Sequence, residues 1–331
     1  MPGAGRRPSE GRPNDWTKSS RGFAIALGLN PSELDRIVAG KEALYLPPRE
    51  ILRDAGRRPR RIDRPNDRLK RIQRKLKDLI SGRVVLPPYL HGSIKGRSPR
   101  TNAAEHRAKK VLVKVDISDF FPSVDEEMVE DILRRQLGAS RQVARAGAAL
   151  LTRHDESDAS RTFLPQGSPG SCIVANLVLD RVDRRIQERA QRLGVTYTRY
   201  LDDIAVSGDR ARELISLIIG LLTREGFRVS RRKLEVVSRG KSQVVTGISV
   251  NRTLSPEPEF RDGCMALYRE GCMASVERLL QVIATLRGKL AYARSLEGTF
   301  AARLAGRLQL LEMRIQDLSL PGGAKGEELA P

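Results

Sequence analysis

The chain has 331 residues, and its 60 lysines and arginines exceed its 40 aspartates and glutamates, which gives a net charge of +20. This excess favours a polyanionic partner, nucleic acid first, and the length allows two or three domains. The three cysteines and three histidines are too few and too scattered for a disulfide framework or a zinc site. Because no apolar run approaches the roughly 18 residues of a membrane span and no signal peptide is visible, we expect a cytoplasmic protein without a membrane partner.

The N-terminal part is basic and is predicted to be helical. Residues 1–19 are rich in Gly, Pro and Arg, and we expect a disordered basic tail there. Residues 20–44 predict two short helices with Asn30 or Ser32 as a cap, in a segment that is more typical of a packing element than of a DNA-binding helix pair. The following "NDRLKRIQRKLKDLI" has apolar residues at helical spacing and basic residues on its other faces. We interpret these basic faces, which include Arg71 and Arg74, as a phosphate-binding surface.

The middle of the chain alternates strands with helices. "KKVLVKVDISDFF", residues 109–121, predicts a strand that ends at Asp116. "TRYLDDIAVSG", residues 198–208, predicts strand, turn and strand, with the pair Asp202–Asp203 at the tip. Residues 163–186 are predicted to form a loop followed by a helix. Residues 226–251 are predicted to form short strands with turns, and residues 264–317 are predicted to be mostly helical.

The adjacent aspartates raise an electrostatic question. Two such charges about 4 Å apart repel by roughly 4 kcal/mol at an effective dielectric of about 20. A divalent cation would offset this repulsion, although an ordinary hairpin turn also accommodates an Asp-Asp pair. If the sheet brings Asp116 beside Asp202 and Asp203, the three carboxylates suit a two-metal phosphoryl transfer. Two Mg²⁺ ions fit such oxygen ligands, and Mn²⁺ would fit as well.

The motifs resemble those of a known family. "DISDFF", "LPQGSPGS" and "YLDD" occur in the order of the palm motifs of reverse transcriptases, and the resemblance covers roughly residues 45–310. "NAAEH" (Asn102–His106) and "VTG" (Val245–Gly247) are similar to signatures of retron reverse transcriptases. The resemblance implies an α+β right-hand polymerase with fingers, a palm built on an antiparallel sheet, and a helical thumb. After the helical segment 20–44, the expected parts are fingers at 45–110, palm with an interleaved fingers segment at 111–253, thumb at 254–317 and a disordered tail at 318–331.

The resemblance also assigns roles at the candidate site. The metal-binding residues are Asp116, Ile117, Asp202 and Asp203, and Lys233 in "GFRVSRRK" lies near the leaving pyrophosphate. Further residues bind the nucleotide: Arg60 at the triphosphate, Phe121 as a steric gate under the sugar, and Gln166 with Gly167 in a tight turn. The RNA-binding set comprises Arg71, Arg74, Asn102, His106, Val245, Thr246 and Gly247. For His106 a hydrogen-bonded structural role remains open.

The function implied by the resemblance is RNA-directed DNA synthesis by a retron enzyme. Such an enzyme would use dNTPs to copy part of its own structured non-coding RNA into branched single-stranded DNA (msDNA), beside a separate effector protein in antiphage defence. A group II intron-like or other prokaryotic reverse transcriptase is the first alternative. A non-catalytic RNA-binding protein on a polymerase scaffold is the second, and the three aspartates argue against it. The joint presence of "NAAEH" and "VTG" favours the retron type.

Overall fold

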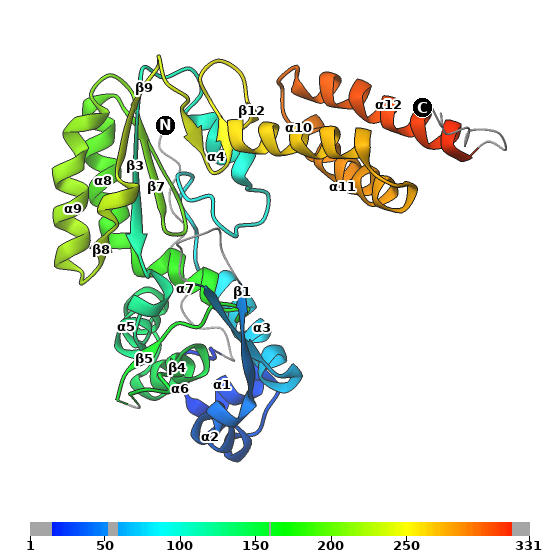
Figure 1. Ribbon diagram of the computed structural model, residues 1–331. Coiled ribbons are helices and arrows are strands. Elements are labelled where there is room, and N and C mark those ends of the chain that lie inside the picture. The colour runs from blue at the N-terminus through cyan, green and yellow to red at the C-terminus, as the bar shows by residue number, and fades with distance from the viewer. Residues whose placement is uncertain (1–14, 52–58, 159, 320–331) are drawn as a thin grey trace, which may run out of the picture.

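The computed structural model describes residues 15–51, 59–158 and 160–319, with only the main chain of Arg60 and Ser319. Figure 1 shows a mainly helical region that includes the N-terminal helices, a central sheet flanked by helices, and a helical bundle that extends to one side. None of the helices in the described ranges has the length and apolar character needed to cross a membrane.

Strand β3 (Val111–Ser118) lies at the centre of the main sheet. It pairs antiparallel with β7 (Asp203–Ser207), which pairs with β6 (Thr196–Tyr200), and on its other side with β8 (Arg228–Val229) and β9 (Glu235–Ser238). Both faces of β3 are buried, since Val113 and Val115 pack in the main core whereas Leu112 packs in a second cluster. Helices α8 (Asp180–Leu193) and α9 (Ile215–Arg224) cover one face of the sheet (Figure 1).

The fingers region is built from helices and one long hairpin. As predicted, Asn30 caps the second helix, since its Oδ1 accepts a hydrogen bond from the amide of Glu33 at 2.8 Å. Trp16 lies within the expected tail but is only 6% exposed and packs against Phe23, so the ordered chain begins earlier than we predicted. Residues 1–14 lie outside the described residues. The elements are α1 (Ser20–Leu27), α2 (Pro31–Ala39), η1 (Lys41–Leu44), β1 (Tyr45–Ile51), β2 (Arg60–Pro65), α3 (Asp67–Ser81), α5 (Glu126–Leu137) and α6 (Arg141–Leu151).

Short elements connect the fingers, the sheet and the bundle. Helix α4 (Pro99–Glu105) packs on a small sheet of β10 (Val244–Val245), β11 (Ile248–Ser249) and β12 (Ser255–Pro256). Helix α7 (Ser171–Val178) follows the turn-rich loop that the sequence predicts. The remaining elements are η2 (Phe121–Ser123), β4 (Arg153–His154), β5 (Thr162–Phe163), η3 (Ala211–Leu214) and η4 (Arg231–Lys233).

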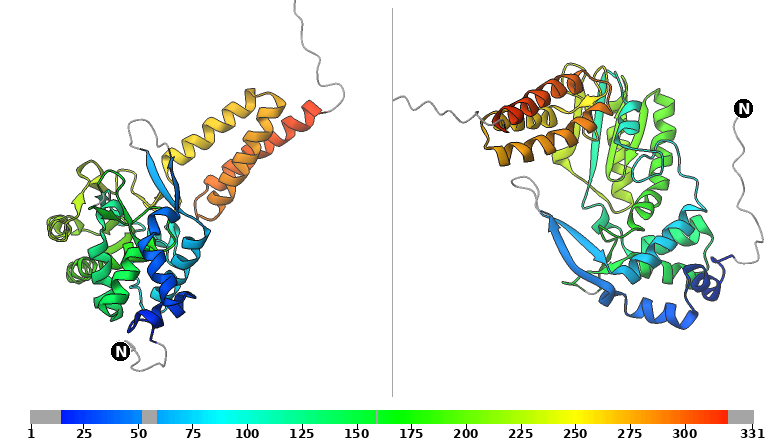
Figure 2. Two further views of the ribbon diagram at one scale, coloured as in Figure 1. Left: turned by 90° about the horizontal axis from the view of Figure 1, so that it is seen from below. Right: turned by 90° about the vertical axis from the view of Figure 1, so that its right-hand side faces the viewer.

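The C-terminal bundle has its own core. It consists of α10 (Pro258–Met273), α11 (Val276–Arg294) and α12 (Phe300–Ser319), packed around fully buried leucines such as Leu279, Leu286 and Leu304. Figure 2 shows that the bundle projects away from the sheet. Fingers, an antiparallel palm sheet and a helical thumb are thus all present, and the predicted α+β right-hand polymerase fold is confirmed.

Candidate active site

Strand pairing brings the three aspartates together. Asp116 lies directly opposite Asp203 in the β3–β7 register, and the amide of Ile117 donates to the carbonyl of Asp202 at 3.2 Å. The turn between β6 and β7 is only two residues long, and Leu201 adopts a positive φ of 56° in it. This strained backbone positions Asp202 and Asp203 at the sheet edge beside Asp116.

The carboxylates repel one another and attract lysine. Asp116 is buried, and the Nζ of Lys233 lies 2.6 Å from its Oδ1. The pKa of Asp203 rises to about 6, first because the surrounding protein displaces part of the water around this carboxyl group, which still reaches solvent, and then because Asp202 and Asp116 carry like charges. The ammonium groups of Lys233 and Lys114 offset part of this effect. The cluster therefore carries unbalanced negative charge that a cation would relieve.

The oxygen atoms of the three aspartates are chemically suited to bind a divalent ion, but they do not converge on one metal position in this structure. All the side-chain donors are carboxylate oxygens, which Mg²⁺ and Mn²⁺ prefer, and Ile117 can contribute only a main-chain oxygen because its side chain is apolar. Within the described ranges, however, no three acidic, histidine or cysteine side chains already converge on a metal position. The ion pair with Lys233 gives a physical reason, because it holds the Asp116 carboxylate toward the ammonium.

A pocket of about 760 Å³ opens beside this cluster. It is wide enough for a nucleotide, and Phe121 and Gln166 both line it, as does Lys233. Phe121 is 7% exposed and packs edge-to-face on Phe120, with 5.8 Å between ring centroids. Phe121 thus lies in the pocket wall, next to the aspartates, where a steric gate would have to lie.

Gly167 serves a contact within the protein. Its φ is 109°, and a Cβ added there would lie 2.7 Å from the carbonyl oxygen of Asp63. The amide of Asp63 donates to the carbonyl of Gln166 at 2.7 Å, so the loop before α7 is joined to strand β2. The sequence predicted Gly167 as a nucleotide-binding residue whose lack of a side chain allows close backbone approach, and the structure shows such an approach to the fingers hairpin at Asp63.

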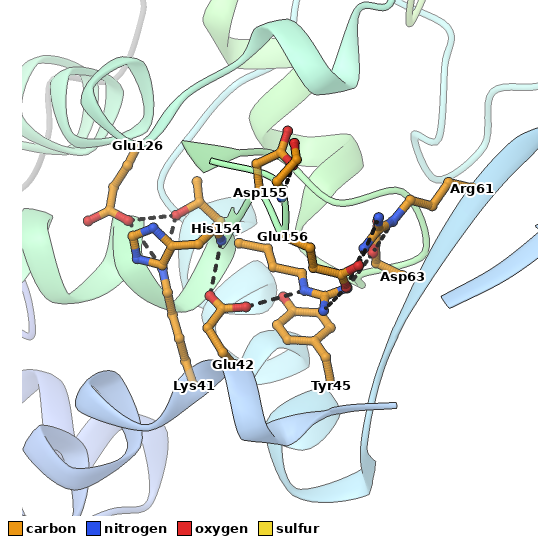
Figure 3. A network of polar contacts seen from close by, with 12 residues as sticks. Lys41, Glu42, Tyr45, Arg61, Asp63, Glu126, His154, Asp155 and Glu156 are labelled. Atoms are coloured by element: carbon orange, nitrogen blue, oxygen red, sulfur yellow. Dashed lines mark hydrogen bonds and ion pairs between the residues drawn. The ribbon is translucent and has the colours of Figure 1, made fainter. Parts of the chain in front are cut away.

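Arg61 is a pocket residue that the sequence analysis missed. It lines the pocket and donates from Nε to Asp63 at 3.0 Å and from Nη2 to Glu156 at 2.8 Å (Figure 3). The buried Arg153 contacts both of these acids, with Nη1 2.6 Å from Asp63 Oδ1. The predicted triphosphate contact, Arg60, has its side chain outside the described residues. The sequence "RRID" contains two adjacent arginines, Arg60 and Arg61. Neighbouring side chains point to opposite faces of a strand, so the sequence alone does not tell which of them faces the pocket.

Arg199 is a buried residue that contacts the turn before Asp202 and Asp203. It is fully buried, and its Nη2 and Nε lie 2.6 and 2.9 Å from the carboxylate of Asp183. Its Nη1 donates to the carbonyl of Leu201 at 2.9 Å, and its Nη2 donates to the carbonyl of Asn176 at the end of α7. Sequence analysis did not identify this residue, because an arginine in a short strand is ordinarily exposed.

The "NAAEH" and "VTG" segments meet at one place. The hydroxyl of Thr246 donates to the carbonyl of Pro99 at 3.1 Å, and Val245 packs in the same cluster as Ala103. His106 is 0% exposed, and its Nδ1 and Nε2 each lie 2.7 Å from a hydroxyl, those of Ser207 and Thr198. Burial lowers the pKa of His106 to about 3.

These observations separate the predicted RNA-binding residues into groups. The neutral, enclosed His106 matches the structural role that the sequence left open, and a direct RNA contact would require this core to open. Asn102 is also buried, at 1% exposure, but it lines a second pocket together with Val245, Thr246 and Gly247. Arg71 and Arg74 lie on the exposed face of α3.

Comparison with known proteins places this site in a family. The family profile described as "Reverse transcriptase (RNA-dependent DNA polymerase)" matches residues 53–258. The chain is 38% identical over 263 residues to the Retron Mx65 reverse transcriptase of Myxococcus xanthus, covering 75% of this chain and 61% of that protein. It is 32% identical to the Retron Mx162 reverse transcriptase of the same organism, covering 77% of this chain and 58% of the relative. It is 26% identical to the Retron Ec86 reverse transcriptase of Escherichia coli, covering 78% of each chain.

A solved structure with some similarity to this chain is that of telomerase from Candida albicans in complex with a fragment of telomeric RNA. The two chains are 9% identical, with a TM-score of 0.47, and the match covers 86% of this chain and 63% of the telomerase chain. The chain spans about three fifths of the length of the two Myxococcus relatives. The resemblance to retron-type enzymes that the motifs indicated is confirmed. With its palm sheet, clustered aspartates and matching sequence, the chain belongs to the reverse transcriptase family, whose members depend in general on divalent metal ions.

Proposed function

We propose that the protein is a retron reverse transcriptase that copies its own structured non-coding RNA into branched single-stranded DNA. The observation that carries the proposal is the register of β3 against β7, which pairs Asp116 with Asp203 at the edge of a nucleotide-sized pocket. The similarity to three retron enzymes supports the subfamily. A role in antiphage defence beside a separate effector protein, and a site of action in the cytoplasm, are part of the same proposal.

The proposed reaction is nucleotidyl transfer from a dNTP. A hydroxyl oxygen of the growing strand forms a bond to the α-phosphorus, the bond from that phosphorus to the pyrophosphate oxygen breaks, and the hydroxyl proton leaves to solvent. Two Mg²⁺ ions, held by Asp116, Asp202, Asp203 and the main-chain oxygen of Ile117, would lower the pKa of the hydroxyl and neutralise the phosphates. The side chains that line the pocket would orient the nucleotide and stabilise the charge of the leaving pyrophosphate.

Lys233 is suited to the leaving group. Its side chain is 49% exposed, and its ammonium already lies against Asp116. The lysine stem is flexible, so the ammonium could turn from Asp116 toward the pyrophosphate in the same pocket and stabilise its developing charge. Arg61 is a candidate for the triphosphate contact, because it lies in the pocket wall with a side chain that is 37% exposed. Its guanidinium would have to leave its ion pairs with Asp63 and Glu156 to bind phosphate oxygens in a bidentate manner.

Phe121 and Gln166 would orient the sugar and base. An aromatic ring under the sugar leaves no room for a 2′-hydroxyl, which favours dNTPs over rNTPs. The carbonyl of Gln166 accepts a hydrogen bond from the amide of Asp63, which fixes the loop where Gln166 lines the pocket. The exposed Arg71 and Arg74 would bind RNA phosphates without reading sequence.

The test is synthesis by the purified protein on a primed RNA template with dNTPs and Mg²⁺, and then on RNA transcribed from the DNA just upstream of its gene, called the upstream RNA. Asp116→Asn should reduce incorporation by orders of magnitude, whereas Asp209→Asn at an exposed ion pair with Lys110 should not. Branched DNA from the upstream RNA supports the retron assignment. Synthesis on generic templates without branched product would indicate another prokaryotic reverse transcriptase, and no synthesis at all would indicate an RNA-binding scaffold.

A further inference from the structure

A buried carboxylate outside the aspartate cluster lines the same pocket. Asp63 on β2 lies in this lining beside Arg61, and its side chain is only 2% exposed. A charge at this place would repel the phosphates of a dNTP, and its burial without a partner would be costly. Neutralisation of Asp63 is therefore a condition for binding a triphosphate in this pocket.

Two arginines share the oxygen atoms of the acids in this network (Figure 3). Asp63 Oδ1 accepts a hydrogen bond from Arg61 Nε at 3.0 Å and another from Arg153 Nη1 at 2.6 Å. Glu156 Oε1 accepts from Nη2 of Arg61 and from Nη2 of Arg153, at 2.8 Å in each case. Each acid therefore keeps one arginine if the other arginine leaves.

The two arginines differ in their surroundings. The side chain of Arg61 is 37% exposed, and its guanidinium lies 6.0 Å from the ring centre of Phe163, which also lines the pocket. Arg153 is 9% exposed and lies outside the described lining of the pocket. Its Nε donates to Glu42 at 3.2 Å, and its guanidinium lies 4.9 Å from the ring centre of Tyr45. Arg61 is thus the arginine that can leave, whereas Arg153 is fixed.

The acids would respond differently to the departure of Arg61. Without Arg153, the buried Asp63 would be left charged beside the phosphates, and this cost would keep Arg61 in the wall. Glu156 is 55% exposed, so water can solvate it after Arg61 has left. The hydrogen bond from Arg61 lowers the pKa of Glu156, so this acid is charged at neutral pH and attracts the same guanidinium that a triphosphate would bind.

We infer that Arg153 is a positioning residue for dNTP binding, because it neutralises Asp63 and Glu156 and so allows Arg61 to exchange these acids for the triphosphate. Glu156 competes with the triphosphate for Arg61. This inference rests on the proposed function and on the assignment of Arg61 to the triphosphate. It predicts that two substitutions in one network change dNTP binding in opposite directions.

The test is the addition of one dNTP to a primed RNA template, with KM and kcat measured separately. Glu156→Gln keeps the size of the side chain and removes the competing charge, so the KM for dNTP should fall about threefold, as expected for an exposed ion pair. Arg153→Gln leaves Asp63 dependent on Arg61, so the KM should rise about tenfold. In both variants kcat should change little, because the binding of the nucleotide is what changes.

Removal of Arg61 gives the measurement that a purely structural role would not change. In an Arg61→Ala background, Glu156→Gln and Arg153→Gln should both leave the KM for dNTP unaltered, because the group through which they act is gone. Arg153→Lys keeps the positive charge but cannot contact both acids in the same way, and it should give an intermediate KM. Glu156→Gln changes an exposed side chain, so the inference stays testable if Arg153→Gln does not fold.

Glu213→Gln is the matched control for Glu156→Gln. Glu213 is 45% exposed and accepts two hydrogen bonds from one guanidinium, that of Arg210, at 2.7 and 2.9 Å. Neither residue of this pair belongs to the described lining of the pocket. Removal of the Glu213 charge should therefore leave the KM for dNTP at the wild-type value.

Three results would overturn the inference while synthesis continues and the proposed function stands. Glu156→Gln could leave the KM for dNTP unchanged or raise it. The substitutions could have the same effects with and without Arg61, as expected if they alter only the packing of the fingers. Arg61→Ala alone could leave the KM unchanged, which would mean that Arg61 does not bind the triphosphate. If the wild-type protein adds no nucleotide to any primer, the proposed function fails and the inference fails with it.

Discussion

Replacing Asp203 with Asn should stabilise the metal-free protein at neutral pH while removing its activity. The pKa of Asp203 rises from 3.8 to about 6, so the folded state holds a proton there more tightly than the unfolded chain does. Between these two values the unfolded state binds fewer protons, and the free energy of unfolding of the wild type falls as pH rises. The loss of unfolding free energy caused by the charged Asp203 is complete above about pH 6 and absent below about pH 4.

The magnitude follows from the size of this shift. A shift of about two units corresponds to about 3 kcal/mol if each unit contributes about 1.4 kcal/mol. The Asp203 side chain is exposed to solvent in the pocket, so screening reduces this figure and we expect about 1 kcal/mol. For a chain of this size that gain raises the melting temperature by about 1–2 °C.

Thermal unfolding of the wild type and of Asp203→Asn at pH 4, 6 and 8, with chelator present, checks the reasoning. The two curves should coincide at pH 4 and separate at pH 8, with the variant higher. Added Mg²⁺ should stabilise the wild type more than the variant. Asp209→Asn removes a charge that is paired with Lys110 and should not raise the melting temperature. A variant that melts below the wild type at pH 8, or by the same difference at every pH, would refute the repulsion argument.

Four further substitutions test the proposed roles of individual side chains. Phe121→Val should increase the incorporation of rNTP relative to dNTP by about tenfold or more, and an unchanged ratio would make Phe121 a packing residue only. Arg61→Ala should raise the KM for dNTP by about 10- to 100-fold with a smaller effect on kcat, and steady-state kinetics that show the reverse would contradict a triphosphate contact. His106→Ala leaves two buried hydroxyls unpaired and should cost about 2–4 kcal/mol in urea unfolding. Because the folded pKa of His106 is about 3, its stabilising contribution should be complete above pH 6.5 and decline as pH falls toward 3. Replacing both Arg71 and Arg74 with Gln should lower the slope of log K for RNA binding against log salt by about 1.4–1.8, whereas an unchanged slope would mean that neither arginine contacts phosphate.

Much of the fold follows from apolar periodicity. The helix over "NDRLKRIQRKLKDLI" buries Leu69, Ile72, Leu76 and Ile80, as the helical spacing predicted, because no other face of α3 can enter the core. The strand ending at Asp116 and the hairpin with Asp202 and Asp203 at its turn could be predicted for the same reason. Their partnership could be predicted only by way of family resemblance, since the two segments lie some 85 residues apart and periodicity does not encode which strands pair.

The polar interior could not be predicted. Arg153 and Arg199 are both buried, and in the sequence they look like the many exposed arginines of a chain with a net charge of +20. Burial of such a charge becomes acceptable only when carboxylates or carbonyls surround it, and most of these partners come from distant segments. His106 shows the same difficulty, because its two hydroxyl partners lie on β6 and β7. A polar motif alone therefore cannot distinguish a ligand contact from an internal one.

Helix α7 links the two halves of the candidate active site. Its N-terminal end follows the loop of Gln166, which is joined to β2 through Asp63. Its C-terminal carbonyls, including that of Asn176, accept hydrogen bonds from Arg199, and the same guanidinium holds the carbonyl of Leu201 before the aspartates. The loop of Gln166 and the carboxylate turn are therefore fixed to opposite ends of one buried helix. The proposed nucleotidyl transfer depends on the positions of both, so the buried Arg199 would contribute to the geometry of the active site at a position where an apolar residue could pack at lower cost.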